Sequence, residues 1–470
     1  MKTLLKGGIK IIILLAIVVA SLFVSSEVLR VRRDEPPNDT YRKVRGYYAL
    51  EEETMDIVML GTSQSYYGMS PAVMYHETGL NMYDFGGECQ PMEVTYHYLV
   101  EALKTQKPQL VILDIFGLAD ASSYCRTDGI YRVNIEELKL SQNKIEAYQL
   151  LENESLLENI FDVSLYHTQW SQMDWETIKT AFEYEENPLF GYTKGARSSD
   201  AIWKRDYIIS EERIKQDEKQ WNGFVQIVEL CEEYNQPLLV VKTPCYLEEL
   251  DAANLAYAYD YLDEKGIPYI DFNLKFNDMG YVFDRDGDMW HASLSGSGMI
   301  TKEVAKYINE NYNLTSIEPE KYREKYESLY NEIVLQLMAE AYTALDALHY
   351  LSVYDELVFY SINKDEGYVL DDDYKGALTI MGINPYNDKN QVSVVDNNWN
   401  QAYGEDEVVT YEYQGVTYEI HPDGAVYRDG VCITKGGNTI SITIIDKLTN
   451  QKMESYCINI EEGFVIRYAE

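Results

Sequence analysis

The chain has 470 residues, which is enough for two or three domains of about 150 residues each. Hydrophobic residues make up 46% and charged residues 25%, and this composition excludes a mainly disordered chain. Forty Lys and Arg residues stand against 78 Asp and Glu residues, giving a net charge of −38. Such an excess of acid excludes nucleic acid as the main partner and disfavours adsorption of the whole surface to anionic lipid.

The N-terminus carries one long uncharged apolar run. Residues 11–26 follow Lys2, Lys6 and Lys10 and are slightly shorter than the about 20 residues of a comfortable membrane span. We expect residues 1–30 to be an uncleaved signal anchor, with a cleaved signal peptide as the alternative. Basic residues on both sides leave the orientation open from charge alone, and the export-like character favours a single-pass cell-membrane protein with its bulk extracytoplasmic.

An alternation of strands and helices follows a juxtamembrane linker at 31–50. Strands are expected at 55–61, 80–86, 109–116, 237–243 and 267–273. Helices are expected at 92–105, 210–235, 251–266 and 293–312. This pattern predicts an α/β domain over 51–312 with a parallel sheet covered on both faces. A site would then form at the carboxyl ends of the strands.

Two further regions complete the chain. Residues 120–210 are helical and aromatic, and we expect an insertion that caps the sheet as a lid. Residues 313–331 are polar and predict a linker before a β-rich α+β domain at 332–470. That domain would contain a helix at 331–351 and strands at 356–363, 409–421, 424–433 and 438–447. Cys432 and Cys457 lie within it and could form a disulfide bond outside the cell.

One serine and one histidine stand out. Ser63 follows the first strand and Gly61, which is where an α/β sheet presents a nucleophile. The alternative is a turn or a helix cap. His291 follows the last strand, on the same edge of the sheet, and Asp288 precedes it by three residues. An Asp there can accept the proton of one ring nitrogen and leave the other as a base toward serine.

The groups that would stabilise an oxyanion are less defined. The N–H groups of Gly86-Gly87, the N–H after Ser63 (Gln64) and the side chain of Gln90 are candidate donors, with an ordinary strand-to-helix turn as the alternative. Asp114 and Lys242-Thr243 end two strands at the same edge. No cofactor or metal site is expected, because the histidines are scattered and the Asp-rich stretches 284–288 and 371–373 are typical of solvated turns.

Together these motifs resemble the SGNH/GDSL hydrolase superfamily over about residues 50–312. The resemblance implies a flavodoxin-like three-layer fold in which Ser63 is nucleophile, His291 base and Asp288 its orienting carboxylate. The branch is similar to membrane-anchored proteins of D-alanyl-lipoteichoic acid biosynthesis (DltD-like) and alginate O-acetyltransferase-like proteins. Thr62 replaces the Asp of the family's first block, and LDIFGLAD at 113–120 replaces its Gly-x-Asn-Asp block. These departures keep a catalytically inactive relative as an alternative.

The C-terminal region resembles the interleukin-like EMT inducer (ILEI/PANDER-like) domain over 354–383 and 430–459. Relatives occur beside sugar-modifying enzymes, so this resemblance implies glycan binding by analogy.

These expectations favour an acyl transferase, most simply an acetyl transferase, that acts on cell-surface polysaccharide. Acyl-CoA is absent outside the membrane, so a polytopic membrane O-acyltransferase (MBOAT-like) would have to supply the acyl group, with residues 11–26 as the docking helix. The alternatives are a carbohydrate esterase with the same triad and an inactive glycan-binding scaffold.

Overall fold

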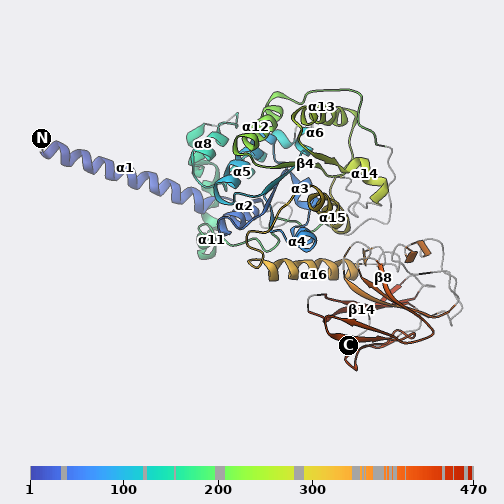
Figure 1. Cartoon of the computed structure of the whole chain (residues 1–470). Coiled ribbons are helices and arrows are strands. Elements are labelled where there is room, and N and C mark those ends of the chain that lie inside the picture. The colour runs from blue at the N-terminus through green and yellow to red at the C-terminus, as the bar shows by residue number, and fades with distance from the viewer. Residues whose placement is uncertain are drawn as a thin grey trace. The chain divides into compact units, whose positions relative to one another are not determined.

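The computed structural model describes most of the chain. Its described residues are 2–32, 40–119, 124–152, 155–195, 207–279, 290–340, 350–351, 354, 356–363, 375–376, 378–379, 384, 389–396, 399–436, 440–447, 449–459 and 464–467. The chain divides into two compact units, Met1–Arg323 and Glu324–Glu470 (Figure 1). Each unit is described by itself below.

The first unit is built on a parallel five-stranded sheet with strand order β2-β1-β3-β4-β5. The strands are β1 (Ile57–Leu60), β2 (Met82–Asp84), β3 (Leu110–Asp114), β4 (Leu238–Lys242) and β5 (Tyr269–Asp271). All five lie within the ranges expected from sequence, and the expected parallel sheet is confirmed. This order is that of flavodoxin-like folds, in which ligands bind where the strand order reverses, here between β1 and β3.

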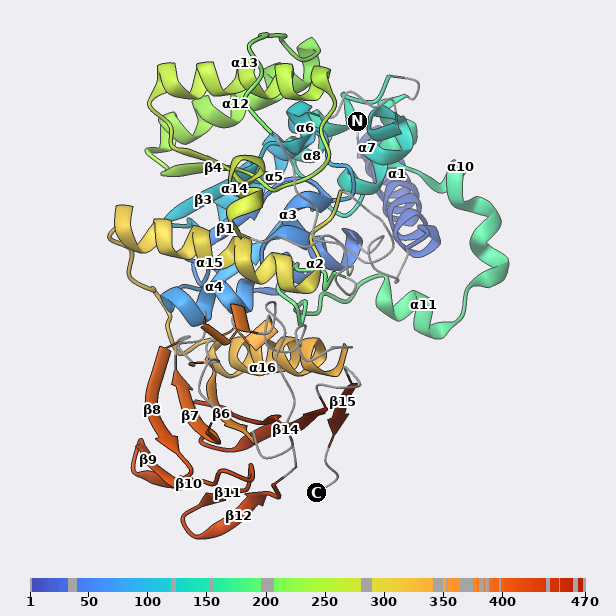
Figure 2. The ribbon, with the colours of Figure 1, turned by 90° about the vertical axis from the view of Figure 1, so that its right-hand side faces the viewer.

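Helices cover both faces of the sheet (Figure 2). On one face lie α4 (Pro71–Thr78) and α15 (Leu294–Asn311), whose apolar side chains share a core with Ile57 and Met59 of β1. The other face carries α5 (Met92–Thr105), α12 (Glu218–Tyr234) and α13 (Glu249–Lys265). The short helices α3 (Ser63–Gly68), α6 (Phe116–Ala119) and α14 (Phe272–Met279) follow directly after β1, β3 and β5.

The N-terminal helix α1 (Lys2–Leu29) is exposed over residues 7–22 and contains a stretch, Gly7–Leu29, that is long and apolar enough to cross a membrane. Helix α2 (Thr40–Ala49) lies within the range predicted to be a linker, so that part of the linker prediction is wrong. The reason is packing: Val44 and Tyr47 are buried, and the Tyr47 ring stacks on Phe85 with centroids 3.9 Å apart.

The insertion is helical, as expected from sequence. Its elements are η1 (Tyr124–Arg126), α7 (Asp128–Ile135), α8 (Gln142–Tyr148), α9 (Leu156–Ile160), α10 (Val163–Tyr166), η2 (His167–Gln172) and α11 (Trp175–Thr180). Helices α10 and η2 pack against α1, α7 packs against α2, and α8 packs against α5. The helical part therefore surrounds the end of α1 rather than capping the sheet as a lid. Within the described part of the insertion, Asn134 of α7 donates to the carbonyl of Glu88 in the turn after β2, and residues 190–195 run along the edge of the sheet.

The second unit begins with α16 (Arg323–Glu340), which starts inside the range predicted as a linker. Two antiparallel sheets follow, a six-stranded one ordered β15-β14-β13-β6-β7-β8 and a four-stranded one ordered β12-β11-β10-β9. The strands are β6 (Leu357–Ile362), β7 (Gln391–Asp396), β8 (Trp399–Glu405), β9 (Val409–Tyr413), β10 (Val416–Ile420), β11 (Val426–Arg428), β12 (Val431–Thr434), β13 (Ile440–Ile445), β14 (Lys452–Asn459) and β15 (Phe464–Arg467). The β-rich region expected from sequence is confirmed.

The hairpin turns follow from their residues. Gln414-Gly415 and Asp429-Gly430 all have positive φ, which two-residue hairpin turns require. Cys432 and Cys457 are not joined by a disulfide bond in this structure, and they lie on strands of different sheets. Much of the first ILEI-like stretch, 354–383, lies outside the described residues.

Candidate active site

Ser63 lies at the carboxyl edge of the sheet, beside the point where the strand order reverses. Gly61, directly after β1, has φ of 150°, and a Cβ atom there would lie 3.0 Å from the Cβ of Asp114. Only glycine fits this turn without strain. The next residue, Thr62, caps α3 by accepting a hydrogen bond from the Gln64 N–H at 3.2 Å. The strand therefore ends abruptly, and Ser63 becomes the first residue of the helix.

The structure brings the predicted serine and histidine together. His291 Nε2 lies 2.8 Å from Ser63 Oγ, although 228 positions separate the two residues. Both side chains are half-buried, so a reacting group can reach them. The Tyr67 ring lies 4.7 Å from the imidazole, centroid to centroid, and limits how the ring can turn. Asp288, the predicted third member, lies outside the described residues, as do the Asp-rich stretches 284–288 and 371–373.

Gln64 joins α3 to the segment that carries the histidine. Its side-chain Nε2 donates to the carbonyl of Trp290, the residue before His291. Its Oε1 accepts from Thr243 Oγ1 at 2.7 Å. The amide is therefore used within the protein, and so is the backbone N–H of Gln64, which donates to Thr62. The expectation that Gln64 faces an oxyanion is not met in this structure, where it positions its neighbours instead.

The other expected oxyanion donors are also engaged within the fold. The Gly87 N–H donates to the carbonyl of Gly61 at 3.1 Å. The buried Gln90 side chain directs Nε2 toward Asn134 Oδ1 at 3.5 Å and accepts from Thr95 Oγ1 at 2.9 Å. These groups are engaged because the turn after β2 packs directly on the turn after β1, and the hydrogen bond from Gly87 to Gly61 joins the two turns. A glycine pair in sequence does not reveal in which direction its N–H groups point.

A chain of hydrogen bonds, which we call the relay, connects the ends of three strands. From the sequence, Asp114 and Thr243 were expected to lie at the same edge of the sheet, but their contacts were not predicted. Asp114 Oδ2 accepts from the Thr243 backbone N–H at 3.1 Å and from its hydroxyl at 3.0 Å. Thr243 Oγ1 also lies 2.7 Å from Gln64 Oε1, so its single hydroxyl proton is shared between Asp114 and Gln64, and Gln64 Nε2 donates to the Trp290 carbonyl. The relay thus runs from β3 through β4 and α3 to the residue beside His291. Polar residues ending two adjacent strands were the sequence signal for it.

Asp84, at the end of β2, forms a hydrogen bond with Ser65 of α3. It is fully buried, and its Oδ1 accepts from Ser65 Oγ and from the Gly86 N–H, both at 3.0 Å. Burial raises the pKa of this carboxyl well above its usual value, and the two hydrogen bonds only partly oppose that effect. The charged carboxylate is therefore less favoured at this buried position than it is for an aspartate in water.

Aromatic side chains border the serine and histidine. Trp290 is exposed, and its ring lies 5.9 Å from Phe116 and 6.1 Å from the exposed Tyr246, between centroids. These residues come from the segment before α15, the end of β3 and the end of β4. They form an aromatic surface beside Ser63.

Residues 191–195 reach the same edge of the sheet from the insertion. The Thr193 N–H donates to the carbonyl of Tyr66 in α3 at 2.8 Å, and Tyr192 OH lies 2.7 Å from Ser297 Oγ in α15. A Cβ atom on Gly195 would lie 2.4 Å from the carbonyl of Ala292, so the strand of chain lies tightly against the residue after His291. The segment therefore fixes α3 and the start of α15 relative to each other.

Comparisons with known proteins give structural neighbours only. No family model matches the chain, and no curated protein matches it. Among solved structures, a protein described as lipolytic and of the G-D-S-L family, from Desulfitobacterium hafniense DCB-2, is 13% identical. That match covers 53% of this chain and 97% of the other, with a TM-score of 0.26. A gut microbial diltiazem-metabolizing enzyme is 12% identical over 55% of this chain and 48% of the other, with a TM-score of 0.21.

Proposed function

We propose that the protein is a membrane-anchored, extracytoplasmic acyl transferase, most simply an acetyl transferase, acting on cell-surface polysaccharide. The observation that carries the proposal is the 2.8 Å contact between Ser63 Oγ and His291 Nε2 at the carboxyl edge of a flavodoxin-like sheet. A serine and an imidazole in this arrangement are the parts of an acyl-transfer site. The resemblance to the SGNH/GDSL superfamily, with its DltD-like branch, places the same chemistry on the same two residues.

The reaction would proceed in two halves. Ser63 Oγ attacks the carbonyl carbon of an acyl donor while His291 Nε2 takes the hydroxyl proton. The tetrahedral intermediate collapses, the leaving group takes that proton, and an acyl-Ser63 ester remains. A sugar hydroxyl then loses its proton to His291 and attacks the ester, which returns the proton to Ser63 and yields the acylated sugar. Asp288 would hold the Nδ1–H and stabilise the imidazolium in both halves.

The membrane and the C-terminal unit supply the context of this proposal. A helix apolar enough to cross a membrane suits a protein that receives its acyl group from a polytopic membrane O-acyltransferase (MBOAT-like). The ILEI-like second unit would bind glycan and present the acceptor. An esterase uses the same residues with water in place of the sugar, and an inactive scaffold would keep only the glycan binding.

The test uses the full chain in detergent with p-nitrophenyl acetate. Ser63→Ala and His291→Ala should each lower kcat/KM by at least about 1000-fold, and the double variant should be little worse than either single one. Ser171→Ala and His167→Ala, both exposed in the insertion, are matched controls that should keep wild-type activity. Equal activity in the wild type and all five variants would remove the assignment of Ser63 and His291.

A second measurement separates the three functions. Wild-type protein is incubated with the ester and an oligosaccharide acceptor, and both the acylated sugar and the acyl-enzyme are measured by mass spectrometry. A transferase gives acylated sugar that depends on Ser63, and an esterase gives acetate alone. An inactive scaffold gives no acyl-Ser63 and no burst of p-nitrophenol.

A further inference from the structure

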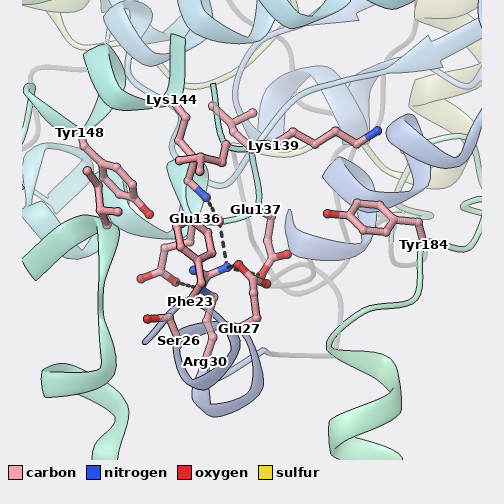
Figure 3. Close-up of a pocket in the computed structure, with 13 residues that line it drawn as sticks. Phe23, Ser26, Glu27, Arg30, Glu136, Glu137, Lys139, Lys144, Tyr148 and Tyr184 are labelled. Atoms are coloured by element: carbon pink, nitrogen blue, oxygen red, sulfur yellow. Dashed lines mark hydrogen bonds and ion pairs between the residues drawn. The ribbon is translucent and has the colours of Figure 1, made fainter. Parts of the chain in front are cut away.

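A pocket of about 200 Å³ lies where α1 enters the body of the first unit (Figure 3). It is separate from the Ser63–His291 site. Its walls come from the last turns of α1, the chain between α7 and α8, helix α8 and the end of α9. We call it the foot pocket. Charged and hydroxyl groups dominate its wall, which is unusual for a buried cavity. Buried charges need partners, because an unpaired charge away from water is unfavourable.

Two carboxylates of the wall already have cationic partners. Glu27 accepts a hydrogen bond from Arg30 and another from Arg32, each at 3.0 Å. Glu137 lies between Arg32 and Arg45, at 2.9 and 2.6 Å. Burial would raise the pKa of Glu137, but the charges of Arg32, Arg30 and Arg45 outweigh it and lower that pKa to about 2. These carboxylates are therefore neutralised by arginine and offer little repulsion to an anion.

The third carboxylate, Glu136, also has cationic partners, Arg132 at 3.3 Å and Arg30 at 3.9 Å. It accepts a hydrogen bond from Tyr166 OH at 2.7 Å. Burial raises its pKa, and the attraction of Arg30 does not fully offset that. Arg30 itself is held by Asp162, at 3.0 Å. Among the described residues the whole cluster holds six basic and four acidic side chains, a positive excess in a chain of net charge −38: Arg30, Arg32, Arg45, Arg132, Lys139 and Lys144 against Glu27, Glu136, Glu137 and Asp162.

Three groups in the wall are left for a ligand. Lys144 Nζ donates one hydrogen bond, to the carbonyl of Glu136, and has no ion pair within the part of the chain that the structure describes. The hydroxyls of Ser26 and Tyr148 have no hydrogen-bond partner there either. Lys144, Ser26 and Tyr148 are 6%, 1% and 2% exposed. Burial and then the nearby Arg30 lower the pKa of Lys144 to about 8, as expected for an ammonium group that lacks an anionic partner.

The position of the pocket indicates where such an anion would come from. The exposed apolar part of α1 ends at the pocket, and Phe23 of α1 packs edge-on against Phe161 at 5.7 Å. Helix α10 and η2 lie beside α1 (Figure 2). The surrounding segment, residues 155–182, exposes Trp170 and Trp175 by 71% and 74%. It also exposes Leu157, Leu165 and Phe182.

Exposed tryptophans next to the end of an apolar helix are typical of the interface between a membrane and water, where lipid headgroups lie. A buried cation with two hydroxyl donors is suited to the oxygens of a phosphate. We propose that the foot pocket binds the phosphate of a membrane phospholipid headgroup through Lys144, Ser26 and Tyr148. The lipid would fasten the first unit to the bilayer beside α1.

The test is a binding measurement on the full chain in detergent. The melting temperature is recorded against increasing concentrations of dihexanoyl phosphatidylglycerol, dihexanoylglycerol, which lacks the phosphate, and inorganic phosphate. Phosphatidylglycerol should raise the melting temperature with saturation, and dihexanoylglycerol should not. Tyr148→Phe and Ser26→Ala should each weaken binding about three- to tenfold, and Lys144→Gln about ten- to a hundredfold.

The controls and the contrary results are specific. Lys179→Gln on α11 removes an exposed lysine from the same region and should bind as wild type does. If phosphatidylglycerol stabilises no more than dihexanoylglycerol, or if the three pocket variants bind as wild type does, the proposal is overturned. If inorganic phosphate saturates the effect at the same concentration, a free anion is the ligand and the lipid assignment is overturned. Tyr148→Phe keeps the test open should Lys144→Gln fail to fold, since it removes one oxygen only.

Discussion

The Ser63–His291 site and the foot of α1 each join segments that are far apart in the sequence, and they do so by different means. At the site, hydroxyls, an amide, backbone groups and the carboxyl of Asp114 make hydrogen bonds, and the side chains of Ser63 and His291 stay half-exposed. At the foot, arginines and carboxylates form a buried ionic cluster. The hydrogen bonds at the site leave both side chains accessible, whereas the ionic cluster holds the end of α1.

Two buried carboxyl groups express the same contrast. Burial dominates at Asp84, below the site, and raises its pKa well above the usual value. Arginine dominates at Glu137, at the foot, and lowers its pKa to about 2. The two pKa values are therefore shifted in opposite directions, and through these two groups the stability of the first unit should depend on pH with opposite sign.

The largest expected effect separates activity from stability at the site. His291→Gln should lower kcat/KM for p-nitrophenyl acetate by at least about 1000-fold. Its free energy of unfolding should change by less than about 1 kcal/mol, because the side chain is half-buried and sits at the edge of the core. Ester hydrolysis and urea unfolding of the same preparation check both statements. If the free energy of unfolding fell by several kcal/mol, the loss of activity would reflect a damaged fold and His291 would not be a residue that serves activity alone.

The next effect tests the foot. Glu137→Gln should destabilise the protein by about 3 kcal/mol at pH 7, because it removes a carboxylate held by three arginines. A depressed pKa contributes stability that is fully present above about pH 4.5 and is lost as the pH falls toward 2. The difference between variant and wild type should therefore shrink below pH 4.5. Glu176→Gln, an exposed change on α11, is the control in thermal melts across this range.

For Asp84→Asn, the stability relative to wild type should change with pH in the opposite direction to that of Glu137→Gln. A raised pKa contributes stability below the unfolded pKa of about 3.9 that is lost as the pH rises toward the folded value. The Asn variant has no carboxyl group and does not lose stability in this way. Within that pH window its free energy of unfolding should therefore rise, relative to that of the wild type, by about 1.4 kcal/mol per pH unit. Unfolding at pH 5, 6 and 7 measures the slope. A constant difference between the two proteins would mean that Asp84 does not titrate differently on folding.

The smallest effect concerns the relay that ends beside the histidine. Gln64→Ala should lower kcat/KM about tenfold, because Trp290 and Thr243 lose their common partner and the imidazole loses its fixed position. Thr243→Ser keeps the hydroxyl and should retain most of the activity. A shift of the pH profile of kcat/KM in Gln64→Ala, absent from Thr243→Ser, would show that the contact acts through His291. Identical pH profiles would assign Gln64 a purely structural role.

The sequence predicted the sheet and the serine–histidine pair because both depend on local signals. Each strand is an uninterrupted apolar run that ends at a polar or turn residue, and a parallel sheet collects the ends of such runs at one edge. Ser63 and His291 were therefore expected to meet. Helix α2 was missed, because its charged residues resemble a linker while Tyr47 supplies the burial that stabilises it.

The remaining differences depend on direction and distance, which residue type alone does not encode. The Gly87 N–H points back to Gly61 because the two turns pack together. Arg30 pairs with Asp162 and Arg45 with Glu137 across long stretches of chain, and each looked like an ordinary surface charge. The insertion was expected over the site, yet the apolar surface available to its helices lies beside α1.

Buried ion pairs join the end of α1 to the rest of the first unit. A helix joined by a flexible linker would let the body rotate freely, whereas Arg30 and Arg32 transmit any movement of the helix to the chain around Glu137. Hydrophobic helices tilt when the bilayer is thinner than their apolar length. In the membrane-anchored protein proposed above, the thickness of the bilayer would then set the orientation of Ser63 relative to the membrane surface.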